Sequence, residues 1–320
     1  MTEIFLNPSM LNDFLATSLR LSMPLVFAAL GGALCERCGV FNIALEGMIL
    51  AGAFGAAVGA FFLDSPVAGL FGGILCGILA GLILATLCVS LGVNQIVVGI
   101  AINLFVVGLT AFLSRVVFGG HASTLNLPGF KPVAVPWLSS IPIIGSVVFT
   151  QDALVYLMYV LVPLFYVIIF FTRWGLSIRA VGENPAAADT AGISVTGIRY
   201  FCLLAGGALG SLGGCYLVLS QVCLFSEEMS AGKGWIALAA IALGRWNPIG
   251  VLLACLLFGA CDALQLRLQF ANPNVPYQIF VTLPYVAAIL ALVGVIGKVT
   301  PPGATGIPYK RGVSREQTII

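Results

Sequence analysis

The sequence predicts an all-α protein that crosses a membrane several times. Of its 320 residues, 60% are hydrophobic and 8% are charged, and the mean hydropathy is +1.10. Soluble domains carry about 25% charged residues. Apolar runs of about 20 residues recur along the chain, which is the length that a helix needs to cross a bilayer. Because lipid offers backbone groups no partners, such runs are expected to be helical. We therefore predict a polytopic helical bundle with about 8–10 transmembrane helices, one of them short or re-entrant.

Eight apolar segments are long enough to cross. They are residues 14–34, 43–63, 67–91, 95–117, 152–172, 195–220, 249–270 and 277–297. A ninth apolar piece, residues 235–244, is too short unless it borrows the polar residues before it, and Gly and Pro bound it on its two sides. Membranes tolerate such a break only where protein or a cavity covers the backbone. The sequence leaves open whether this piece spans or dips and returns.

Basic residues predict the orientation of the bundle, because Lys and Arg concentrate in cytoplasmic loops. The connection 173–199 and the residues after 297 carry seven of the 14 basic residues and are expected inside; the N-terminus and the connection 118–151 are then expected outside. Residues 1–300 are interpreted as a single transmembrane domain. Residues 301–320 are expected to form a short, loose cytoplasmic tail.

The residue types give little support for catalysis or metal binding. The nine cysteines lie mostly in apolar segments and are expected to act as small buried hydrophobes. Cys35 and Cys38 form a C-x-x-C, but no second pair stands near it and His121 is the only histidine. No phosphate-binding loop is found, and a net charge of +2 does not indicate nucleic acid. We predict a protein that is not an enzyme; if it transports actively, an ion gradient or another subunit supplies the energy.

Polar residues inside apolar segments are costly and often functional. Gln95, Gly99 and Asn103 lie at i, i+4 and i+8, so they form one polar stripe on a helix. Asn103 falls near the middle of its segment, with Gly99 leaving room beside it. We predict that this stripe lines a substrate pathway. The alternative is that these side chains form interhelical hydrogen bonds that fix the bundle.

Two further polar groups have the same two interpretations. Asn42 and Glu46 share a face at the start of the second segment, and they are predicted to line the pathway too. Glu46 instead pairs with Arg37 or with a helix N-terminus in the alternative interpretation. Asp262, Gln265 and Gln269 share a face of the segment 249–270, with Arg267 near its outer end; they either serve a function there or form interhelical hydrogen bonds that fix the bundle.

The stretch VGENPAAADTAGI, residues 181–193, predicts a short capped helix at 184–191. Asn184 is a good N-cap, Pro185 suits the first helical position, and Gly192 suits the C-terminal end. Such a short helix is not stable alone in water, so it must pack against another surface.

Four motifs together resemble a known family. They are CERCGVFNIALEGMILAGAF, GVNQIVVGIAINLFVVGLTAF, RAVGENPAAADTAGISV and GKGWIALAAIALGRWNPIG, and they occur in the family's order. They are similar to the permease subunits of ABC importers for nucleosides and simple sugars, over residues 20–297. The E-R-x-G-x-x-N-I version is most similar to the nucleoside branch, and a riboflavin branch looks much alike. Cys35 and Cys38 depart from the family, which has small residues there.

The resemblance implies a role for the short helix and a set of partners. The helix, at about 183–192, would be a coupling helix that docks on a cytoplasmic ATPase, through Gly182, Glu183, Asn184, Pro185, Ala188, Asp189 and Gly192. ATP and Mg would bind to that ATPase, and this chain would bind no cofactor. The other partners would be an extracytoplasmic substrate-binding protein and a second permease, expected to be a paralogue in a heterodimer.

The implied location is the bacterial cytoplasmic membrane, with the C-terminus inside and the N-terminus outside. Nucleosides are favoured as the substrate over riboflavin or a sugar. A secondary transporter or channel without an ATPase is the alternative of another class. It would need an ionisable coupling site, for which Asp262 and Glu46 are the candidates, and it would not need the helix at 184–191.

Overall fold

Long apolar helices form most of the protein, as the composition predicts. The computed structural model describes residues 8–119, 125–136, 144–271, 276–295 and 300–309. Within them, seven helices are long and apolar enough to cross a membrane. They are α2 (Pro8–Arg37), α3 (Leu45–Leu63), α4 (Pro66–Ala85), α5 (Gln95–Phe118), α7 (Ala153–Phe171), α10 (Val195–Tyr216) and α12 (Pro248–Ala271). The predicted all-α polytopic fold is therefore confirmed.

Shorter elements connect the long helices. They are the π-helical segments η1 (Thr86–Ser90) and η4 (Leu217–Val222), the helices α6 (Ile144–Val148), α8 (Arg173–Glu183), α9 (Pro185–Thr190), α11 (Lys233–Leu243), α13 (Tyr277–Val281) and α14 (Leu283–Val295), and the strands β1 (Val133–Ala134) and β2 (Thr150–Gln151). The two strands pair antiparallel. The predicted segment 277–297 is not one helix, because the chain breaks at Thr282 and restarts as α14, with Pro284 in the first turn.

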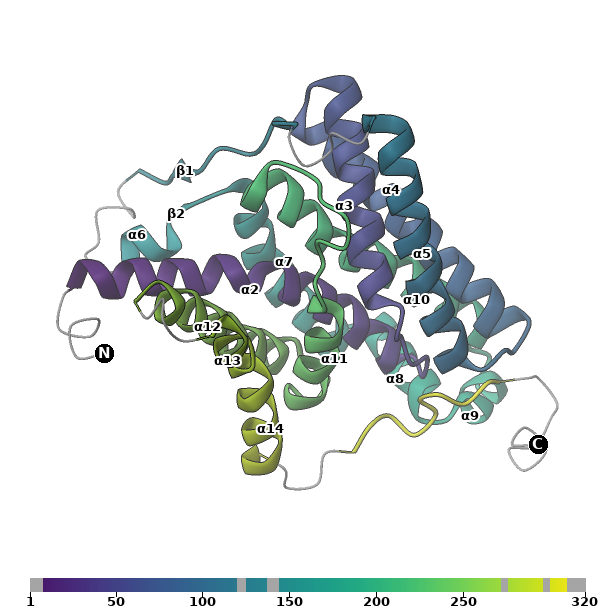
Figure 1. Ribbon diagram of the computed structural model, residues 1–320. Helices are drawn as coiled ribbons and strands as arrows, with labels where there is room; N and C mark the ends of the chain where they lie inside the picture. The colour runs from purple at the N-terminus through teal and green to yellow at the C-terminus, as the bar shows by residue number, and fades with distance from the viewer. Residues whose placement is uncertain (1–7, 120–124, 137–143, 272–275, 296–299, 310–320) are drawn as a thin grey trace.

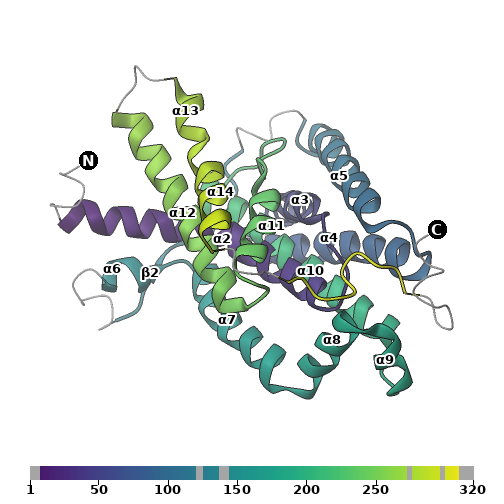
Figure 2. The same ribbon diagram turned by 90° about the horizontal axis from the view of Figure 1, so that it is seen from below.

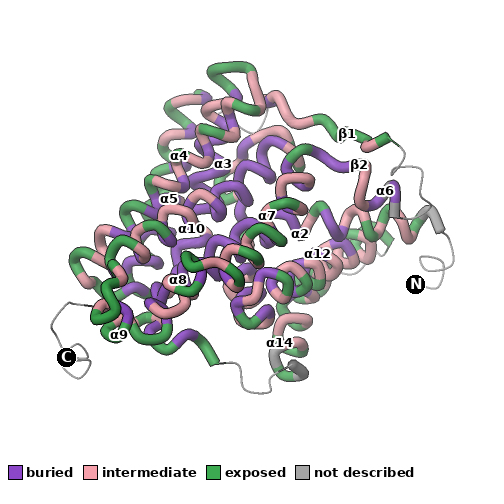
Figure 3. The backbone as a smooth tube through the Cα atoms, turned by 180° about the vertical axis from the view of Figure 1, so that it is seen from behind, coloured by how far each residue is buried: buried purple, intermediate pink, exposed green. Residues whose placement is uncertain are grey.

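Three helices lie at the centre of the bundle. Within their most apolar windows, α10 is 83% buried and α2 and α3 are each 67% buried, whereas α4, α5, α7 and α12 are at most a third buried. Figure 3 shows this difference as a buried interior behind exposed outer helices. Small residues permit the close approach: a Cβ on Gly31 of α2 would lie 2.5 Å from the carbonyl oxygen of Gly206 on α10.

The helix α11 is the short piece expected between residues 235 and 244. Its 11 residues extend about 16 Å at 1.5 Å each, which is too short to span alone. Sharp backbone bends bound it, with positive φ at Ala231 and Gly232 before it and at Arg245 and Trp246 after it. It packs against α2, α3, α12 and α14. Protein therefore covers the broken backbone, as a buried half-helix requires.

The two ends of the bundle differ in their elements. The helices α8 and α9 and residues 300–309 lie together at one end, which we call the α9 end (Figures 1 and 2). The strands and α6 lie at the other, which we call the α6 end (Figure 1). This matches the prediction that the connections 118–151 and 173–199 are on opposite sides; which side is cytoplasmic stays a prediction.

Candidate functional site

The helix α9 has the caps that the sequence predicts. The side-chain oxygen of Asn184 accepts a hydrogen bond from the backbone N–H of Ala187 at 3.1 Å, and Pro185 is the first helical residue. The chain leaves the helix through Gly192, whose φ of +81° suits glycine. The predicted short helix at 184–191 is therefore confirmed, while its docking role stays a prediction.

A small apolar cluster supports α9 from behind. Ala188 is 4% exposed and packs with Val181 of α8 and Val195 of α10, and Tyr309 joins them from the C-terminal residues. Ala188 therefore faces into the protein, and its predicted contact with a partner stays a prediction. The outward face of α9 presents Ala186, Ala187 and Thr190, all of them exposed. Sequence reasoning missed this because four residues are too few to define a helical face.

Gly182 and Glu183 bind neighbouring chain segments at the end of α8. Gly182 lies within the helix, and a Cβ there would collide with the carbonyl oxygen of Arg37, so the glycine permits close packing. The Gly182 carbonyl accepts from the N–H of Ala304 at 2.8 Å. The Glu183 carboxylate accepts from the N–H of Gly303 at 3.2 Å.

Residues 300–309 are packed rather than loose. Ala304 is 2% exposed, and Arg199 at the start of α10 donates to the carbonyl of Ile307 at 3.4 Å. The expectation of a loose tail is therefore wrong for these residues; residues 310–320 lie outside the described part. Residues 300–309 bind the rest of the protein mostly through backbone hydrogen bonds. Such bonds leave no pattern of apolar side chains, so the sequence did not predict this packing.

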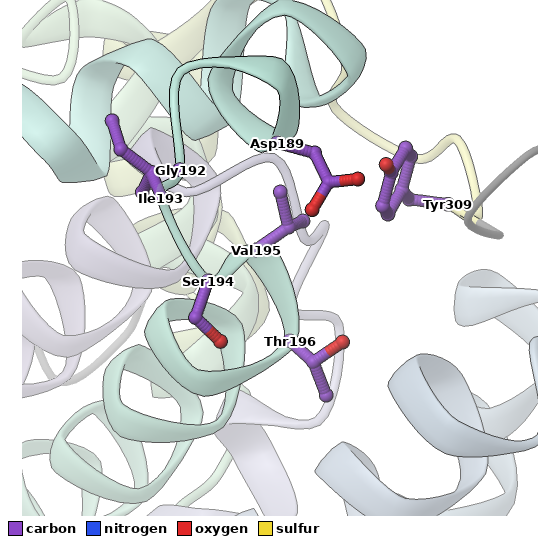
Figure 4. A pocket seen from close by; sticks show the side chains of 7 residues that line it. All are labelled: Asp189, Gly192, Ile193, Ser194, Val195, Thr196 and Tyr309. Carbon is purple, nitrogen blue, oxygen red and sulfur yellow. The ribbon is translucent and has the colours of Figure 1, made fainter.

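A pocket of about 330 Å³ lies where these segments meet. Its lining includes Asp189 of α9, the turn at Gly192 and Ile193, Ser194 and Thr196 at the start of α10, and Tyr309 (Figure 4). Figure 4 shows Asp189 and Tyr309 on one side of this pocket and Ser194 and Thr196 on another. The α9 end thus presents small exposed side chains beside a polar pocket.

The polar stripe of α5 faces the irregular segment between α2 and α3. The Gln95 side-chain oxygen accepts from the N–H of Phe41 at 2.7 Å. A Cβ on Gly99 would lie 2.8 Å from the Cβ of Ile43, so this glycine makes room for the backbone. The Asn103 side chain accepts from the Gly47 N–H at 2.8 Å and donates to the Ile43 carbonyl at 3.0 Å.

These contacts support the bundle-fixing interpretation of the stripe. Gln95 is 1% exposed and Asn103 is 7% exposed, and their amides bind the non-helical backbone of Phe41 and Ile43 and a free N–H in the first turn of α3. Such backbone needs partners inside a membrane. Asn42, also buried, accepts from the N–H of Ala44 at 3.1 Å. A pathway role for Asn42, Gln95, Gly99 and Asn103 stays a prediction.

Glu46 binds the N-terminus of the half-helix α11. Its two carboxylate oxygens accept from the backbone N–H groups of Gly232 at 2.8 Å and Gly234 at 2.6 Å. An anion at a helix N-terminus is favoured by the free N–H groups and by the helix dipole. Of the two partners expected for Glu46, the structure shows the helix N-terminus, and a pathway role for Glu46 stays a prediction. Arg37 instead donates to the Trp246 carbonyl at 3.1 Å, just beyond the other end of α11.

The remaining expectations concern Asp262 and the cysteines. Asp262 and Gln265 of α12 line a cavity together with Lys233. Sequence reasoning did not connect Lys233 to these two residues, because backbone bends before α11 bring Lys233 to the cavity. Gln269 lies outside that lining and is exposed. Cys35 and Cys38 are buried free thiols. Among the described residues, no cluster of His, Cys, Asp and Glu could hold a metal ion.

Within the described residues, seven helices long and apolar enough to span, a buried half-helix and a capped helix at one end define a polytopic membrane protein. The chain belongs to the family described as branched-chain amino acid transport system / permease component, which it matches over residues 14–296.

Curated relatives match almost the whole chain. A guanosine ABC transporter permease of Bacillus subtilis is 36% identical, over 90% of this chain and 93% of the relative. A nucleoside ABC transporter permease of Lactococcus lactis is 37% identical, over 93% and 97%. A putative glucose ABC transporter permease of Haloferax volcanii is 34% identical, over 84% and 87%.

One solved structure has the same fold. It is the inward-facing conformation of a putative metal-chelate type ABC transporter, with a TM-score of 0.50 and 16% identity, over 92% of this chain and 88% of that one. At this identity the likeness concerns the fold alone.

Proposed function

We propose that this chain is the permease subunit of an ABC importer that carries nucleosides across the bacterial cytoplasmic membrane. The supporting observation is the identity of 36–37% with permeases named for guanosine and nucleosides, over nine-tenths of the chain. In this proposal a separate ATPase, which binds ATP and Mg, drives transport, and an extracytoplasmic binding protein delivers the substrate.

The α9 end is the proposed docking site for the ATPase. It presents the exposed residues Ala186, Ala187 and Thr190 on a capped helix. Caps and turns at Asn184, Pro185 and Gly192 shape this surface. The polar groups near it are the carboxylates of Glu183 and Asp189. The α9 end then faces the cytoplasm and the α6 end faces outward.

A second, paralogous permease is the proposed membrane partner. Lactococcus lactis and Bacillus subtilis each have two relatives of this chain that are named as permeases of nucleoside or guanosine transport, and the second of each pair is 27–28% identical to it. Two different permeases per transporter would explain the pairs. A single chain then supplies half of the transport pathway.

The glucose relatives support a sugar as the second candidate substrate, at 34% and 29% identity. Substrate uptake separates the two. The permease, its paralogue, the ATPase and the binding protein are reconstituted in proteoliposomes, and uptake of radiolabelled guanosine and glucose is measured with and without ATP. We expect ATP-dependent uptake of guanosine that unlabelled glucose does not reduce. Uptake of glucose alone would contradict the nucleoside substrate, and uptake that is independent of ATP would contradict the ABC mechanism.

A further inference from the structure

Five polar side chains surround a cavity among the elements α2, η4, α11, α12 and α14. The cavity has a volume of about 350 Å³. Gln221 reaches it from η4, Lys233 from the first turn of α11, Asp262 and Gln265 from α12, and Tyr285 from α14. Leu21, near the middle of α2, also lines it. The cavity therefore lies within the thickness of the bundle and not at the α9 end.

Within the described part of the chain, these five side chains make no hydrogen bond or ion pair with the protein. Asp262 and Lys233 attract each other across the cavity, but their charged atoms do not come within ion-pair distance. Polar and charged groups in membrane helices normally pair with one another, and unpaired groups that face a cavity mark a ligand or substrate route. The polar groups of this cavity are therefore available to form hydrogen bonds with a molecule that is not part of the chain.

The protein holds Lys233 in place through its neighbours. The N–H groups of Gly232 and Gly234, on either side of Lys233, donate to the carboxylate of Glu46. Glu46 thus fixes the start of α11 and with it the backbone of Lys233. Asp262 and Gln265 project from one face of α12, three residues apart. Helical backbone thus places Lys233, Asp262 and Gln265 around the cavity.

Gln221 connects the cavity to the α6 end. It also lines a second pocket, of about 150 Å³, together with Arg20, Asp152 and Ser220. Gln221 and Ser220 belong to the π-helical turn η4, and such turns occur frequently at functional sites. Polar groups thus continue from the cavity toward the end that the orientation places outside.

We propose that this cavity binds the transported nucleoside, an assignment that rests on the proposed function. The Asp262 carboxylate accepts hydrogen bonds from the two ribose hydroxyls. Lys233 and Gln265 bind polar atoms of the ligand, and the ring of Tyr285, which is 49% exposed, stacks on the base. The negative charge of the Asp262 carboxylate and the positive charge of the Lys233 ammonium balance each other, so the site favours a neutral ligand. The volume is at the small end of ligand sites, which suits a nucleoside.

The first experiment compares two ligands in the reconstituted transporter. Uptake of guanosine and of 2′,3′-dideoxyguanosine, which lacks the two hydroxyls, is measured for the wild type and for Asp262→Asn. Hydrogen bonds to a charged group are strong, so Asp262→Asn should raise the KM for guanosine about tenfold and leave the KM for the dideoxy compound nearly unchanged. The binding protein is the same in both complexes, so its own preference cancels in the ratio. Gln269→Leu, on the same helix outside the cavity, is the control and should match the wild type.

A second pair of variants tests the stacking without disturbing a half-buried charge. Tyr285→Leu should raise the KM about fivefold or more for both ligands, because base stacking on an aromatic ring is lost. Tyr285→Phe retains the ring and loses only the hydroxyl, so its KM should rise less than the KM of Tyr285→Leu. The thermal unfolding midpoint of each purified complex shows whether the variant is folded.

The outcomes separate the two proposals. If the wild-type complex takes up no nucleoside, the proposed function fails. If it does take up guanosine, but Asp262→Asn affects both ligands equally or Tyr285→Leu transports like the wild type, the cavity is not the nucleoside site and this inference is overturned.

Discussion

Asn103 is a buried amide whose partners are backbone atoms of another segment. Its oxygen and its nitrogen bind Gly47 and Ile43, on the two sides of the turn that leads into α3. One side chain thus satisfies a free N–H in the first turn of α3 and a carbonyl of the turn before it, inside the bundle, where no water is available to do so. At the residue scale, the polar side chains of the α5 stripe stabilise the fold through hydrogen bonds to backbone.

We predict that Asn103→Leu lowers the free energy of unfolding by about 1–3 kcal/mol, because it leaves two buried backbone groups without partners. Thermal unfolding of the purified protein measures this. Thr110→Val on the same helix is the control, because the Thr110 hydroxyl bonds only to carbonyls of its own helix and its loss should change stability little. A fall in transport rate per folded molecule, with unchanged stability, would instead support the pathway role of Asn103.

Glu46 gives a second prediction at the residue scale. Glu46→Gln keeps the shape but removes the charge, and its NH₂ group cannot accept from Gly232 or Gly234. We expect the start of α11 to loosen, with a loss of about 1–3 kcal/mol of stability. Hydrogen–deuterium exchange of residues 230–236 should increase more than exchange of α4. Unchanged exchange in this segment would show that the carboxylate does not hold α11.

At the scale of elements, α9 separates into an inward and an outward face. Ala187 is exposed, and Ala188, one residue on, is buried against Val181 and Val195. The same substitution at these two positions should therefore act on different properties: on partner binding at Ala187 and on internal packing at Ala188.

We predict that Ala187→Trp weakens binding of the ATPase about fivefold or more and leaves the stability of the permease unchanged. Ala188→Trp should overpack the cluster and destabilise the permease by about 1–3 kcal/mol. Copurification with the ATPase and thermal unfolding measure the two effects. Normal ATPase binding by Ala187→Trp would contradict the proposed docking face.

Residues 300–309 give a further prediction at this scale. Removal of residues 300–320 deletes the backbone hydrogen bonds from Gly303 and Ala304 to α8, and also the Tyr309 contact. We expect less ATP-dependent uptake per folded molecule. The matched control lacks only residues 310–320 and retains each of these contacts, so it should transport like the full chain. Equal loss in both truncations would place the function in the last residues instead.

At the scale of the whole molecule, the bundle has two chemically different ends, and labelling tests their orientation. The half-buried thiols Cys76, Cys223 and Cys261 are first changed to Ala, so that they do not react with the label. Leu125→Cys and Ala186→Cys are then compared in this background. A membrane-impermeant thiol reagent added outside intact cells should label residue 125 and not residue 186. The reverse pattern would invert the proposed orientation.

The sequence predicted what depends on local composition. Apolar length revealed the spanning helices, and Asn184, Pro185 and Gly192 revealed α9, because caps act within one turn. It did not reveal that Ala188 faces inward, that residues 300–309 pack on α8, or that Lys233 and Asp262 share a cavity. These features depend on contacts between segments far apart in the chain, and no local pattern encodes them.

The packing of residues 300–309 on α8 also bears on how the protein is made. A ribosome releases the N-terminal part of a chain first, and domains begin to fold in that order. The Gly182 carbonyl and the Glu183 carboxylate can bind Ala304 and Gly303 only after nearly the whole chain has been synthesised. The finished surface at the α9 end therefore exists only on chains that extend through residue 309. If the proposed ATPase binds this surface, it selects chains that include residues 300–309 over chains that end before them, and assembly of the transporter waits until this segment has been synthesised.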